Sequence, residues 1–124
     1  MRRAMTILAM LAGLSSPFVQ AAGAADKIEA LGTPDHIKVE ALRMVTRNGF
    51  LNVQAEIVNT STANRTLYYR FKWLDSAGFA VGDEEPWKAV TLVGLQKKAL
   101  QTMAMQPTAT DFRLELQAPE NSAW

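Results

Sequence analysis

The residue types that most often carry out chemistry are sparse in this sequence. His36 is the only histidine and cysteine is absent, so a metal site built from several histidines or thiolates is excluded. A Ser–His–Asp triad would have to use His36, and a nucleophile needs a base that is held rigidly. We interpret His36 as a solvated residue. No glycine-rich phosphate loop is present, so the sequence predicts no catalytic residue and no cofactor.

Two further clusters carry side chains that can bind metal ions. Asp83-Glu84-Glu85 offers carboxylate oxygens suited to Ca²⁺, and Met103 and Met105 offer the soft thioethers that suit copper. Consecutive residues of one loop rarely converge on a single ion, and alternating methionines at the end of a strand more often pack. We interpret the acidic run as a solvated loop and predict no metal site. A metal- or small-ligand-binding role remains an alternative function.

Two groups of polar and aromatic residues are candidates for binding. Tyr68, Arg70 and Lys72 alternate with apolar residues, so they share one face of a strand. Trp87 and Lys88 follow a proline in a loop, and tryptophan is enriched where proteins contact one another. Cross-strand ion pairing, or packing of the tryptophan in the core, would explain the same residues. Our hypothesis is that these five residues contact a partner.

The first group lies on the most regular segment of the chain. Leu67, Tyr69, Phe71 and Trp73 recur with a period of two, which predicts a central strand at about 66–74 with one apolar, aromatic face. Other strands are expected at 37–45, 50–58, 79–81, 87–93, 98–104 and 110–117. Short strands at this spacing, without a long helix, predict an all-β fold: an immunoglobulin-like antiparallel β-sandwich of about seven strands.

Local signals define details of this sandwich. Asn48-Gly49 predicts a type I′ hairpin turn, and a change of apolar face near Ala41 predicts a bulge. The expected core consists of the inward residues of the central strand and of the strands around it. These are Leu51, Val53, Ile57, Tyr69, Phe71, Trp73, Leu100, Phe112, Leu114 and Leu116.

The N-terminus has the pattern of a secretory signal peptide. Arg2 and Arg3 precede an apolar run at 4–14, and small residues two apart end at Ala21. We predict a signal peptide at 1–21 that is cleaved after Ala21, with Ala24 as the second choice. A flexible leader at 22–36, with a turn of helix at 26–31, and a β-sandwich domain at 37–118 complete the expected organisation.

Export determines the expected location and partners. Cleavage removes Arg2 and Arg3, which changes the formal charge from +1 to −1, and a near-neutral chain is not expected to bind nucleic acid. The apolar run is too short for a usual transmembrane helix, so no transmembrane segment is expected in the mature chain. A bacterial lipoprotein needs a cysteine, and this sequence has none. We therefore expect a periplasmic protein that is not a lipoprotein.

Three segments and two single residues carry a family resemblance. They are Tyr69-Arg-Phe-Lys-Trp-Leu-Asp75, Val90-Thr-Leu92, Ala109-Thr-Asp-Phe-Arg-Leu-Glu-Leu116, Gly78 and Trp87. In these positions the chain resembles the YcfL family of Gram-negative envelope proteins. The resemblance covers about residues 37–117. It implies a periplasmic β-sandwich of unknown function, without catalytic residues to carry over. Some members are encoded beside an activator of a peptidoglycan synthase, which implies an envelope protein or a peptidoglycan-related assembly as partner.

The combined expectation is a non-enzymatic, exported β-sandwich that binds a protein or another component of the cell envelope. A self-associating structural module is a further alternative, because the sequence does not determine the oligomeric state. Many family members are lipoproteins, and the absence of cysteine distinguishes this chain from them.

Overall fold

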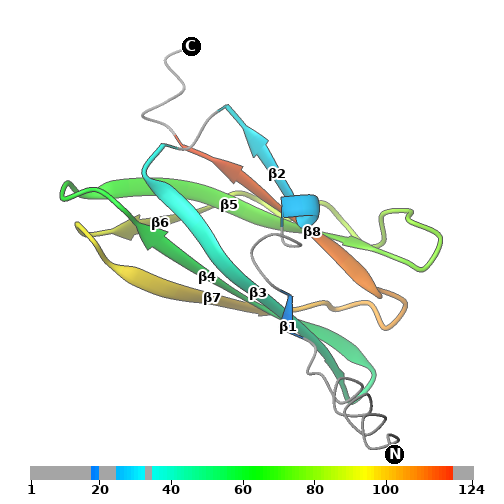
Figure 1. The fold of residues 1–124 in the computed structure, drawn as a ribbon. Coiled ribbons are helices and arrows are strands. Elements are labelled where there is room, and N and C mark those ends of the chain that lie inside the picture. Colours follow the sequence, from blue (N-terminus) through cyan, green and yellow to red (C-terminus); the bar gives the residue numbers. More distant parts are fainter. Residues whose placement is uncertain (1–17, 20–24, 33–34, 119–124) are drawn as a thin grey trace, which may run out of the picture.

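The structure is a computed structural model that describes residues 18–19, 25–32 and 35–118. In these ranges, two facing sheets form a sandwich, which confirms the predicted all-β fold (Figure 1). One sheet has the order β1-β3-β4-β7 and the other β2-β8-β5-β6. The elements are β1 (Phe18–Val19), the 3-10 helix η2 (Ala25–Lys27), β2 (Ile28–Leu31), β3 (Ile37–Arg47), β4 (Phe50–Asn59), β5 (Arg65–Leu74), β6 (Lys88–Leu92), β7 (Lys97–Met103) and β8 (Asp111–Gln117).

Most of the predicted signal peptide, and both expected cleavage positions, lie outside the described residues. Within the described ranges, no helix has the length and apolar character needed to cross a membrane.

The chain crosses repeatedly between the two sheets. The connections β4–β5, β6–β7 and β7–β8 each join one sheet to the other. As a result, β4 pairs with β7 and β5 pairs with β8, although neither pair is consecutive in the sequence. These long-range antiparallel pairings link the two halves of the chain. The central strands β4, β5 and β8 therefore fix where the loops that follow them begin.

Both local signals in β3 and its hairpin are confirmed. Asn48 and Gly49 have φ angles of 52° and 85°, the positive values that a type I′ turn requires. The register of β3 against β4 shifts between Val39 and Ala41, which is the predicted bulge. The extra residue turns Leu42 to the core side of the sheet, and this is why the apolar face changes along the sequence.

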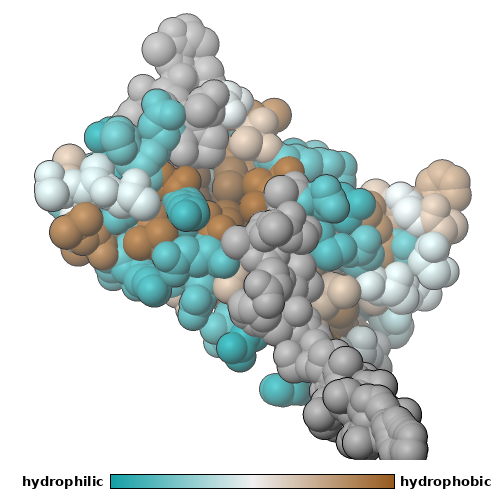
Figure 2. Space-filling view, in the orientation of Figure 1, coloured by the Kyte–Doolittle hydropathy of each residue, from teal (hydrophilic) through white to brown (hydrophobic). Residues whose placement is uncertain are grey.

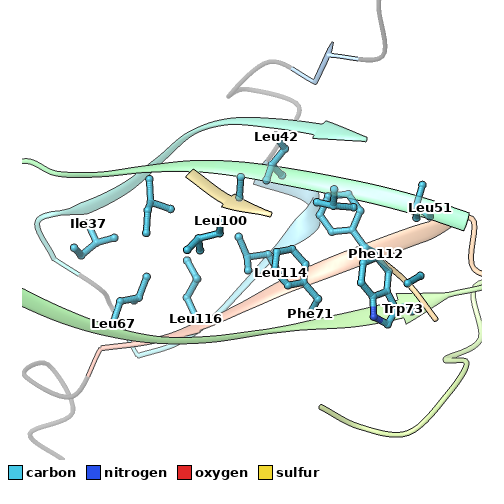
Figure 3. Packing of buried hydrophobic residues seen from close by; sticks show 14 of the residues in the cluster. Ile37, Leu42, Leu51, Leu67, Phe71, Trp73, Leu100, Phe112, Leu114 and Leu116 are labelled. Atoms are coloured by element: carbon cyan, nitrogen blue, oxygen red, sulfur yellow. The ribbon is translucent and has the colours of Figure 1, made fainter. Parts of the chain in front are cut away.

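The core lies between the sheets, and aromatic rings from β5 and β8 fill one part of it (Figure 3). Phe71 and Trp73 stack with ring centroids 5.8 Å apart, and Phe112 packs against both. Every residue of the predicted core is buried except Tyr69, which is partly buried and packs against the cluster. On the face seen in Figure 2, hydrophobic residues gather between the sheets and hydrophilic residues flank them.

Two segments differ from the expectation. Residues 28–31 form strand β2, which pairs in parallel with β8, so the expected turn of helix is wrong there. The reason lies in the tertiary structure. The edge of β8 that faces away from β5 is available for pairing, and β2 pairs with it. Residues 79–81 do not form a strand, because only the isolated bridge between Leu74 and Ala80 is present.

A charged contact attaches the segment around η2 to β8. Lys27 Nζ lies 2.7 Å from Asp111 Oδ1 and 5.6 Å from the centroid of the Phe112 ring. Partial burial alone would raise the pKa of Asp111. Hydrogen bonds from Lys27, the Phe112 amide and Arg113 outweigh this effect and lower that pKa below the ordinary value of 3.8. Asp111 therefore stabilises the fold in its charged form.

Among the described residues, one polar side chain, Asn59, is completely buried. Its Nδ2 donates to the carbonyl oxygens of Ala63, Leu92 and Val93 at 2.7, 3.1 and 3.1 Å. Its Oδ1 accepts hydrogen bonds from the amide and hydroxyl groups of Ser61 at 2.9 and 2.8 Å. Asn59 thus joins the loop after β4 to the end of β6, across the two sheets.

Replacing Asn59 by Ala should lower the free energy of unfolding by about 2–4 kcal/mol, because buried carbonyl oxygens lose their donor. The control is Asn52→Ala, which removes one hydrogen bond to the Phe50 carbonyl. That variant should lose less than about 1 kcal/mol. Urea unfolding of the three proteins measures the difference, and equal losses would contradict the assignment.

The stability difference between the native protein and Asp111→Asn should depend on pH. A carboxyl group whose pKa is lowered by folding stabilises the protein above its unfolded-state pKa, and this contribution is lost as the pH falls through the folded-state pKa. The native protein should be more stable than Asp111→Asn at pH 6, and the gap should close below the ordinary pKa of 3.8. A gap that stays constant in urea unfolding between pH 6 and pH 2 would refute this prediction.

Candidate functional site

The structure places four of the five candidate contact residues on or beside the outer face of the β2-β8-β5-β6 sheet. Tyr68, Arg70 and Lys72 alternate along β5 with the buried residues of that strand. Trp87 immediately precedes β6 and lies over Arg70. Lys88 is different, because it pairs with Tyr69 in the register and its Nζ lies 5.9 Å from the centroid of that inward ring. Lys88 therefore belongs to the opposite face.

Arg70 lies at the centre of this surface, and each nitrogen of its guanidinium has a polar partner. Nε donates to Glu115 Oε1 at 2.5 Å, Nη2 lies 2.9 Å from Glu84 Oε2, and Nη1 donates to the Glu85 carbonyl at 3.3 Å. The guanidinium carbon is 4.4 Å from the centroid of the Trp87 ring, within the range of a cation–π contact. Arg70 is thus held in one orientation against Trp87.

Carboxylates compensate the positive charge of this surface. Arg70 and Glu115 are register partners across β5 and β8, and the hydrogen bond from Arg70 to Glu115 is the main reason that the pKa of Arg70 is raised above its ordinary value. Lys72 Nζ lies 3.4 Å from Glu29 Oε1 and 3.9 Å from Glu115 Oε2. A simple anion would have to compete with these carboxylates. The carboxylates therefore disfavour capture of a free anion at this surface.

Glu85 holds the loop that carries Trp87. Its Oε1 accepts a hydrogen bond from the Phe71 amide, and its Oε2 accepts one from Trp73 Nε1, each at 3.1 Å. The side chain of Glu85 is 21% exposed, and Lys88 Nζ lies 3.6 Å from Oε1. One carboxylate therefore connects the loop to the backbone and to the buried tryptophan of β5.

The position of this carboxylate follows from a gap in the pairing of β5. Strand β6 pairs with β5 only as far as Tyr69, and the return of the chain after the turn pairs again at Trp73, whose carbonyl accepts a hydrogen bond from the Val81 amide at 3.0 Å. The Phe71 amide lies between these two contacts. Because an unpaired backbone amide is costly, the side chain of Glu85 takes the place of a neighbouring strand there.

The interpretation of 83–85 as a solvated loop is wrong for Glu85 and holds for Asp83, which is exposed. The Glu84 side chain is 76% exposed but ion-paired with Arg70. Together with β5 and Glu115, the loop encloses a hollow of about 160 Å³. In the part of the chain that the structure describes, no group of three or more His, Asp or Glu residues is arranged to hold a metal ion.

The other chemical candidates lie apart from this surface. His36 is exposed, with a φ angle of 67°, and its carbonyl accepts hydrogen bonds from the Thr60 amide and hydroxyl groups. Met103 and Met105 are 45% and 75% exposed, so the expectation that both pack in the interior is wrong.

Replacing Glu85 by Gln should lower the free energy of unfolding by about 1–2 kcal/mol. The amide has only one oxygen, so either the Phe71 amide or the Trp73 indole loses its acceptor. Glu84→Gln is the matched control, since the Glu84 side chain is 76% exposed and its partner among the described residues is the Arg70 guanidinium. It should change stability much less. Equal effects of the two substitutions in thermal and urea unfolding would contradict the structural role of Glu85.

Solved structures contain the same fold. The crystal structure of the Campylobacter jejuni protein cj0090 is 28% identical, with a TM-score of 0.62, and the match covers 74% of this chain and 97% of that chain. A DUF1425 family member from Shewanella sp. pv-4 is 30% identical, with a TM-score of 0.60, and the match covers 64% of this chain and 75% of that one.

Among curated proteins, none matches the chain. The family comparison assigns residues 26–118, which include every element from β2 to β8. The chain therefore belongs to the family described as "Protein of unknown function (DUF1425)".

Proposed function

We propose that this protein is exported to the periplasm and has no catalytic role there, and that it binds another protein of the cell envelope. The binding surface is the Arg70–Trp87 surface, which we define as Tyr68, Arg70, Lys72, Trp87 and the exposed backbone beside them. The observation that carries this proposal is the ordered contact of Arg70 with Trp87, held by Glu84, Glu85 and Glu115.

Pre-organisation is the reason that this contact favours binding. Arginine and tryptophan are enriched among the residues that supply most of the energy of protein interfaces. Binding costs less when such side chains are already ordered in the free protein. Arg70 loses little rotamer freedom on docking, because its guanidinium already has three polar partners and a stacked ring. Tyr68, 36% exposed, extends the surface along β5.

The sequence supports the location. Arg2 and Arg3, the apolar run at 4–14 and the small residues before the cleavage position are the parts of a signal peptide. The resemblance to the YcfL family, a finer assignment than the family of unknown function, also favours an envelope partner, such as a component of a peptidoglycan-related assembly. Since the sequence contains no cysteine, lipid attachment is not part of the proposal.

Site-specific photo-crosslinking in exporting cells tests this function. A photoreactive residue at Ala89, which is exposed and pairs with Tyr68 in the register, lies next to the surface. It should give a discrete cross-linked product that is lost in Trp87→Ala and in Arg70→Gln. The control probe replaces Ser76, in the exposed turn after β5. Absence of a product from Ala89, or the same product from Ser76, would contradict the proposal.

A further inference from the structure

The free edge of β7 is the longest edge, among the described strands, that is neither bulged nor paired. Strand β7 pairs with β4 on one side, and no described strand pairs with it on the other (Figure 1). Its seven residues pair with β4 without a register shift, and none of them is proline. Strands β6 and β2 have only five and four residues, and β3 carries the bulge and pairs with β1. A long, uninterrupted edge is where a further strand can add to a sheet.

The side chains of β7 restrict how such a strand can pair. Leu100 faces the core and is 6% exposed, whereas Ala99, Gln101 and Met103 face outward and are exposed. Lys98 shares the inner face with Leu100, yet it is exposed. An inward lysine on an edge strand is one of the devices that oppose unwanted pairing. Lys98 therefore permits only those registers in which no second cation lies opposite it.

We propose that β7 pairs with β7 of a second copy of this chain, as antiparallel strands related by a two-fold axis at Leu100. This register uses all seven residues of each strand. Like charges directly opposite one another destabilise a sheet, and this register contains no such pair. The residues that lie opposite one another across the axis are Ala99 and Gln101, Lys98 and Thr102, Lys97 and Met103, and Leu100 and its own counterpart.

The other symmetric registers are poorer. An axis at Lys98 would set two lysines directly opposite one another. An axis at Ala99 or at Gln101 would leave only residues 97–101 or 99–103 paired. The axis at Leu100 also brings two core leucines together on the inner face, so hydrophobic contact continues from one sandwich to the other. The sequence of β7 is thus self-complementary in one register.

The expected assembly is a weak, closed dimer. Each copy offers one β7 edge, so a two-fold pair uses both edges and cannot grow into a chain. Pairing of seven-residue strands buries less surface than a standard protein interface, so the dimer should dissociate at micromolar concentration. The Arg70–Trp87 surface lies on the outer face of the other sheet and takes no part. Dimerisation can therefore be tested independently of the proposed function.

Sedimentation of the exported protein over a range of concentrations tests whether the dimer forms, and amide NMR shifts locate it. We expect a monomer–dimer equilibrium with concentration-dependent shifts centred on residues 97–103, while residues 88–92 of β6 stay unchanged. A protein that remains monomeric up to millimolar concentration, or a dimer whose shifts lie on another element, would overturn the proposal.

Paired substitutions test the register. Ala99→Lys with Gln101→Lys sets lysines opposite one another on both sides of the axis and should weaken the dimer roughly tenfold. Ala99→Lys with Gln101→Glu sets lysine opposite glutamate and should leave the dimer at least as strong as the native one. The control, Ala89→Lys with Thr91→Lys, adds the same net charge at exposed positions of β6 and should leave dimerisation unchanged. Equal weakening by the two lysine pairs, or by the two β7 variants, would contradict pairing centred on Leu100.

Discussion

The arrangement of the Arg70–Trp87 surface depends on one hydrogen-bonding requirement, the need to satisfy the amide of Phe71. Strand β6 leaves β5 at Tyr69, and the returning chain regains contact only at Trp73. The Glu85 carboxylate fills this interval and also accepts the indole N–H of the core tryptophan. Because backbone donors are rarely left unpaired, the loop has a defined path, and that path sets Trp87 against Arg70.

The outer faces of the two sheets carry different side chains. On the β2-β8-β5-β6 sheet, cations and carboxylates are paired, so the distinctive element is an ordered tryptophan beside an ordered arginine. On the other sheet, a groove lined by residues of β3, β4 and β7 includes Arg43 and Arg47. The Arg70–Trp87 surface is the one that we propose contacts a partner.

Much of the fold could be predicted from periodicity alone. The alternation along β5 correctly assigns Phe71 and Trp73 to one face and Arg70 to the other, because a strand has only two faces. The Asn48-Gly49 turn and the bulge near Ala41 follow from equally local signals. Strand β2 could not be predicted in this way, since its four residues have no clear period and depend on the free edge of β8.

The candidate site could be predicted only in part, for the same reason. Composition and spacing indicate Arg70 and Trp87, but not their contact, which spans the loop between β5 and β6. The role of Glu85 was missed because an acidic run before a proline has the pattern of a solvated loop. Only the fold shows that the Phe71 amide needs an acceptor there. Asn59 is a similar case, since its buried hydrogen bonds join segments distant in sequence.

The most direct test of this account is the NMR signal of the Arg70 side chain. With the guanidinium carbon 4.4 Å from the centroid of the Trp87 ring, the Arg70 protons should show upfield ring-current shifts in the native protein. In Glu85→Ala these signals should move to ordinary arginine values while the fold persists, and in Glu84→Ala they should stay largely shifted. Unchanged Arg70 shifts in Glu85→Ala would contradict the claim that the Glu85 carboxylate positions Trp87.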